Sequence, residues 1–269
     1  MTVVQTDRWL LRTKNQPLQI CEKLKPSFKG YSTEAIYELL TSYGMFRKPI
    51  KGYLNHVKSW QERQFWKVIH KELNKLRQKW NGPDVPIYIL PSDPFNRQLL
   101  MHHNGKSGLA FRDQIFLFIS PKTTEQELAA LFTHEYNHVC RLSKYVKKEY
   151  EYTLLDTIIL EGLAENAVRE QIGESYLASW TDIYSSHQLK KYWKDILLPA
   201  STIPIDHPKH DVLLYGLRLY PKMLGYAVGY HLVHQYLTSN NLTIKDIINQ
   251  QSETIAQFTT DNKKKQTEN

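Results

Sequence analysis

Hydrophobic and polar positions follow two different periods along this chain. Apolar residues recur every three to four positions in the first 80 residues, which predicts helices over residues 32–43 and 54–80. Asn81-Gly82-Pro83 ends that pattern. The stretches VPIYIL (85–90) and LAFRDQIFLFI (109–119) are rich in β-branched and aromatic residues, which predicts strands.

The helical period returns after Pro121. A capping box can begin at either Thr123 or Thr124, ahead of a helix that should run to about Leu142. Later helices are expected over residues 151–170 and 221–238. Strands early and helices late predict an α+β fold. We expect a basic helical N-terminal segment (1–80), a main domain (81–258) and a disordered tail (259–269).

Composition narrows the class of protein. With 269 residues, 41% hydrophobic and 23% charged, the chain can bury a sizeable core and is expected to be globular. No stretch approaches the roughly 18 apolar residues of a membrane span, and the first residues lack the apolar region of a secretory signal. Two cysteines without a CxxC pair fit a reducing compartment, so we expect a cytoplasmic protein.

The net charge of +8 is concentrated at the start of the chain. Residues 1–80 hold 16 Lys and Arg against 6 Asp and Glu, whereas residues 81–269 hold 19 against 21. The later part therefore carries no basic excess for phosphates, and no nucleic-acid partner is expected. The basic segment is interpreted either as a contact for an acidic partner or, more simply, as solvated helix faces.

The sequence His134-Glu135-Tyr136-Asn137-His138 is an HExxH motif. On a helix its two histidines stand one above the other and can share a zinc ion, while Glu135 can reach a water at the metal. Glu135 and His138 also fall in the middle of the apolar stripe of this helix, where core residues belong. Buried polar groups cost several kcal/mol unless they are paired or bind a metal, which favours a functional site.

Catalytic zinc usually takes a third protein ligand. Arg141 and Lys144 stand where the metzincin pattern requires Gly and His, so that pattern is excluded. The next predicted helix instead offers Glu161, on its apolar face, and Glu165 one turn later. We expect Glu161 to bind the metal and Glu165 to accept a hydrogen bond from a liganding histidine, most simply His134.

These residues carry a family resemblance. HEYNHV followed by EGLAE resembles the gluzincin zinc metallopeptidases, although Glu165 stands where many members have Asp. TLLDTIILEGLAE and GYAVGYHLV look like the YjaZ-type predicted zinc-dependent proteases of bacteria, over about residues 85–238. The resemblance implies a thermolysin-like (zincin) core with a small sheet, an HExxH helix and a mainly helical C-terminal half. It also implies a strand at the edge of the substrate cleft.

The resemblance further implies one catalytic zinc ion, with Glu135 as general base. A Tyr or His that stabilises the carbonyl oxygen is expected among Tyr226, Tyr230 and His231, with Tyr226 as first choice, although core or cleft aromatics explain these residues equally well. Gly225 and Gly229 should let another helix approach closely.

The sequence thus predicts a zinc metallopeptidase that acts on peptides or unfolded protein. Two alternatives remain. One is a catalytically idle zincin-fold binding protein that uses its basic N-terminal segment, and Glu135 argues against it. The other is a basic nucleic-acid-associated protein with a fortuitous HExxH sequence.

Overall fold

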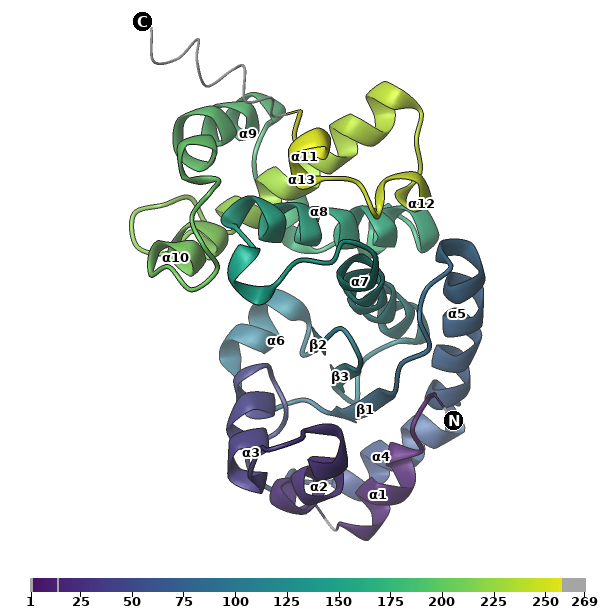
Figure 1. The fold of residues 1–269 in the computed structure, drawn as a ribbon. Coiled ribbons are helices and arrows are strands. Elements are labelled where there is room, and N and C mark those ends of the chain that lie inside the picture. The colour runs from purple at the N-terminus through teal and green to yellow at the C-terminus, as the bar shows by residue number, and fades with distance from the viewer. Residues whose placement is uncertain (1, 14, 258–269) are drawn as a thin grey trace, which may run out of the picture. The chain divides into compact units, whose positions relative to one another are not determined.

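The computed structural model describes residues 2–13 and 15–257 and has the expected α+β composition (Figure 1). The chain divides into two compact units, Met1–Val139 and Cys140–Asn269. The expected boundary after residue 80 falls inside the first unit, and the expected disordered tail lies outside the described residues. Among the described residues, no helix combines the length and the apolar character needed to cross a membrane.

The first unit begins with helices packed around a small sheet. Their bounds are α1 Thr6–Arg12, α2 Pro17–Leu24, α3 Thr33–Ser42, α4 Tyr53–Glu62 and α5 Phe65–Trp80. The helix expected over residues 32–43 is confirmed as α3. The Ser32 side chain caps this helix by accepting a hydrogen bond from the Ala35 N–H. The single helix expected over residues 54–80 is wrong. Gln64 adopts a left-handed backbone (φ 54°), and this conformation separates α4 from α5.

The sheet has three strands in the order β1-β3-β2. β1 (Ile87–Pro91) pairs parallel with β3 (Ile115–Ile119), and β2 (Ser107–Ala110) pairs antiparallel with β3. The stretch 109–119 is therefore a hairpin, closed by a hydrogen bond from Phe111 N–H to Gln114 O, and α6 (Arg97–His103) lies between β1 and β2 in the sequence.

The two outer edges of the sheet differ. The outer edge of β1 bonds to the N-terminal residues, since Ile87 N–H donates to Thr2 O and Val4 N–H donates to Ile87 O. Among the described residues β2 pairs with β3 alone. β2 is therefore the strand with a free edge.

Helix α7 (Glu125–Lys144) follows the sheet and is held by aromatic contacts. Its capping box begins at Thr124, one of the two expected positions, whose side chain and backbone exchange hydrogen bonds with Glu127. Tyr136 stacks on Trp80 of α5 at 6.2 Å between ring centroids, and its hydroxyl donates to Pro83 O at 2.9 Å. These contacts fix the rotation of α7 about its axis.

The second unit is helical and packs around α8 (Leu154–Gln171), which matches the expected helix over residues 151–170. Figure 1 shows α11 (Leu224–Asn240) and α13 (Ser252–Ile255) beside α8. The other helices are α9 Ser186–Tyr192, α10 Lys209–Tyr215 and α12 Ile244–Ile247. The apolar residues of α8, α10 and α11 form a core whose buried members include Leu154, Ile158, Leu214, Leu224 and Val228.

Candidate metal centre

Helix α7 places the two histidines of the HExxH motif one turn apart. The His134 and His138 ring centroids lie 4.7 Å apart with the rings nearly perpendicular, at 87°. His138 is 8% exposed and Glu135 7% exposed, so both are buried as the hydrophobic pattern predicts. Such burial of polar groups on a helix face is costly unless they are paired or bind a ligand.

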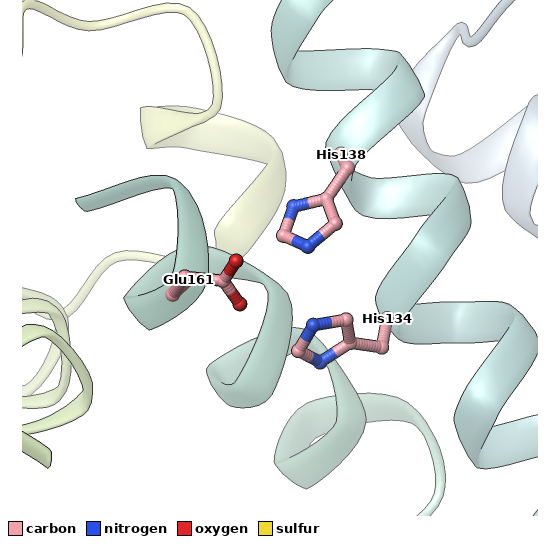
Figure 2. Close-up of side chains that lie close together, drawn as sticks. All are labelled: His134, His138 and Glu161. Atoms are coloured by element: carbon pink, nitrogen blue, oxygen red, sulfur yellow. The ribbon is translucent and has the colours of Figure 1, made fainter. Parts of the chain in front are cut away.

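Glu161 of α8 joins the two histidines. One ligand atom of each of the three residues lies within 4.8 Å of the others, and Figure 2 shows the carboxylate facing both imidazoles. These are the three side chains that the sequence predicts as metal ligands. Within residues 2–13 and 15–257, these three side chains are the group that could hold a metal ion.

The chemistry of this donor set fits zinc. Two imidazole nitrogens and one carboxylate oxygen are a set that catalytic zinc sites use, with one coordination position left for water or substrate. Ca²⁺ and Mg²⁺ instead favour oxygen ligands throughout. The three residues therefore match a zinc ion better than a hard cation.

Glu135 points to the sheet of its own unit. The atoms that a Cβ on Gly108 of β2 would meet first belong to the Glu135 side chain. The local pattern around Glu135 does not predict this partner. A glycine inside a strand does signal a close approach of other atoms, and Gly108 in the stretch SGLA carries that signal.

Glu165 lies one turn after Glu161 and is 4% exposed. Its Oε1 atom accepts a hydrogen bond from the Ala178 N–H at 2.6 Å. The carboxylate therefore also ties the chain after α8 to that helix. The hydrogen bond expected between Glu165 and His134 stays a prediction.

The candidate oxyanion donors lie on α11. The rings of Tyr226 and Tyr230 both pack edge-on against Trp180, at 5.3 and 6.5 Å between centroids. Burial raises the pKa of the Tyr230 phenol, with the Glu165 charge adding to the shift and Arg169 opposing it. Tyr230 thus lies within electrostatic reach of α8 and keeps its proton at neutral pH.

His231 has different surroundings. Burial lowers the pKa of its imidazole, and the positive charge of Lys190 on α9 lowers it further. Its neutral form is therefore favoured near pH 7.

Comparisons with known proteins agree with this geometry. The sequence profile of the family described as "Predicted Zn-dependent protease (DUF2268)" matches residues 65–257. The uncharacterised protein YjaZ of Bacillus subtilis (strain 168) is 42% identical over 257 residues, which is 94% of this chain and 98% of that protein. The uncharacterised protein YjfC of the same organism is 24% identical over 198 residues, 70% of this chain and 64% of that protein. No known solved structure matches the chain.

Proposed function

The chain belongs to the family of predicted Zn-dependent proteases, and from that premise we propose that it is a zinc metallopeptidase of gluzincin type. The observation that carries the proposal is the meeting of His134, His138 and Glu161, which would hold one zinc ion. A bound zinc ion supplies Lewis-acid polarisation of the scissile carbonyl and makes a water in the site more acidic.

Glu135 has the role of general base in this proposal. Its carboxylate takes a proton from the attacking water and later delivers that proton to the leaving amine. Its position next to the two histidines on α7, with its side chain turned to β2, supports this role. A purely structural metal site has no use for such a carboxylate.

Charge develops on the carbonyl oxygen as the water attacks, and a hydrogen-bond donor there lowers the barrier. We assign this role to Tyr230 rather than to Tyr226, the first choice from the sequence. The packing of α11 against α8 at this residue supports the assignment, because Asn166 of α8 donates a hydrogen bond from Nδ2 to the Tyr230 backbone O at 3.0 Å. A donor role for His231 stays a prediction.

The substrate that suits this arrangement is an extended peptide or an unfolded protein segment. β2 offers a free strand edge, and Glu135 lies beside Gly108 in that strand. A peptide that adds to β2 as a further strand passes close to the carboxylate, and its backbone can be held by main-chain hydrogen bonds. A thermolysin-like core, with β2 at the edge of the cleft, is part of this proposal.

The alternative of a catalytically idle binding protein is not favoured. It would leave the buried Glu135 carboxylate without a chemical role.

An acidic partner for the basic N-terminal helices remains a proposal for a second surface of the protein. So does a cytoplasmic location, which fits the two free, buried cysteines Cys21 and Cys140.

Hydrolysis of fluorescein-labelled casein by the purified protein tests the proposed function. We expect hydrolysis by the wild type, loss of at least about 100-fold in Glu135→Gln, and inhibition by 1,10-phenanthroline that added zinc reverses. Gln preserves the shape of the side chain and removes the base, so zinc content should stay the same. Equal activity in wild type and Glu135→Gln contradicts the proposal.

A further inference from the structure

Gly108 occupies an unfavourable place for a glycine. It lies inside the four-residue strand β2 (Ser107–Ala110), where a glycine weakens the strand relative to other residues. Its backbone is not among the left-handed conformations of the chain, so the local geometry accepts any L residue. The reason for a glycine here must therefore lie in what surrounds it.

The surroundings of Gly108 are the side chain of Glu135. A methyl group built on Gly108 would come closer than 3.0 Å to Oε1, Cδ and Cγ of Glu135, a separation that real Cβ atoms essentially never show. Glu135 has little room to move away, because it is 7% exposed. The next residue, Tyr136, holds the helix by stacking on Trp80 and by its hydrogen bond to Pro83 O.

We propose that Gly108 is a positioning residue for Glu135. The missing side chain leaves the space that the Glu135 carboxylate fills against the edge strand. Its consequence for catalysis rests on the proposed function, whereas the steric contact itself does not. With alanine at residue 108 the carboxylate is displaced, and a displacement of about 1 Å at a reacting group costs roughly 100-fold in rate.

A double-mutant cycle measured by thermal unfolding tests the contact without any assay of activity. An isolated Gly→Ala change in a strand raises stability. Here Gly108→Ala should instead lower Tm by roughly 3 °C or more, because of overpacking against Glu135. In the Glu135→Ala background the same change should leave Tm unchanged or raise it.

Glu135→Gln provides the matched control, since glutamine has the shape of glutamate without its charge. The loss of Tm caused by Gly108→Ala should persist in that background if the contact is steric. An equal effect of Gly108→Ala in the wild-type and Glu135→Ala backgrounds overturns the proposal.

The catalytic consequence is tested by zinc content and casein hydrolysis of Gly108→Ala. We expect the zinc content of the wild type, a kcat lowered about 100-fold and a KM close to that of the wild type. Full activity of Gly108→Ala, in a protein whose activity depends on Glu135, overturns the positioning role. If the wild type shows no Glu135-dependent hydrolysis, the proposed function fails, and the unfolding cycle then decides the contact alone.

Discussion

Gly162 of α8 and Gly229 of α11 bring the backbones of their two helices into direct contact. A methyl group on Gly162 would overlap the carbonyl of Gly229, and one on Gly229 would overlap the carbonyl of Ile158. The close helix approach expected at Gly229 is thus confirmed. This crossing sets the distance between the helix of Glu161 and the helix of Tyr230.

Alanine at either glycine of this crossing should therefore destabilise the protein. Gly→Ala in a helix normally stabilises by up to about 1 kcal/mol. For Gly162→Ala and Gly229→Ala we expect instead a loss of about 2 kcal/mol, because the added methyl forces the helices apart. Urea unfolding measures this change, and a gain in stability would show that the helices are not in contact there.

A second set of predictions concerns the buried carboxylate of Asp156. Lys147 Nζ lies 2.9 and 3.0 Å from its two oxygens, and the Ser252 hydroxyl donates to it at 2.7 Å. Removal of one partner of such a pair leaves an uncompensated charge. Asp156→Ala should lower the free energy of unfolding by about 3 kcal/mol, as measured in urea. A loss below about 1 kcal/mol, the value for an exposed ion pair, would contradict the pairing.

The stability contributed by Asp156 should depend on pH. Burial raises the pKa of this carboxyl, but the hydrogen bonds from Lys147, Ser252 and the Thr153 backbone outweigh burial and hold the pKa below its usual value. A lowered pKa in the folded protein means that the contribution is present above the unfolded-state pKa, about 3.9 for Asp, and is lost as the pH falls through the folded-state pKa. The stability difference between wild type and Asp156→Asn should therefore be constant from pH 7 to 5 and shrink below about pH 4. A difference that does not change with pH would contradict this account.

Glu161 and Glu165 should differ in their effect on metal binding. Loss of a direct ligand in Glu161→Ala should weaken zinc binding by more than about 1,000-fold, whereas loss of an outer partner in Glu165→Ala should cost about 10- to 100-fold. Competition with a fluorescent zinc chelator measures both affinities. The reverse order would mean that the roles of the two carboxylates are exchanged.

Tyr230→Phe and Tyr226→Phe are a matched pair for the oxyanion donor. Each removes one hydroxyl and keeps the ring that packs on Trp180. We expect kcat for casein hydrolysis to fall about 100-fold in Tyr230→Phe with little change in KM, and to change little in Tyr226→Phe. The opposite result would return the role to Tyr226.

Much of the metal centre could be predicted from the sequence because its signals are local. The i, i+4 spacing of His134 and His138 fixes their shared helix face, and the capping box at Thr124 marks where that helix begins. The burial of Glu135 and His138 follows from their place in an apolar stripe. The prediction of Glu161 also used the hydrophobic pattern of the next helix, whose apolar face includes this carboxylate.

The remaining features depend on contacts between distant residues or on rare backbone states. Nothing in the local pattern around Gln64 favours the left-handed conformation that divides α4 from α5. The sequence assigns Arg141 no role beyond a departure from the metzincin pattern. It is in fact 2% exposed and donates to Ile248 O at 3.0 Å, 107 positions away. The contact of Gly108 with Glu135 also joins two separate elements.

X-ray absorption at the zinc edge of the purified protein tests the metal centre most directly. The account predicts about one zinc per chain, nitrogen and oxygen ligands at roughly 2.0–2.2 Å, two of them imidazoles, and no sulfur at about 2.3 Å. The double variant His134→Ala, His138→Ala should carry no zinc. A wild-type protein that holds no zinc when supplied with it, or a double variant that retains the same spectrum, would contradict the account.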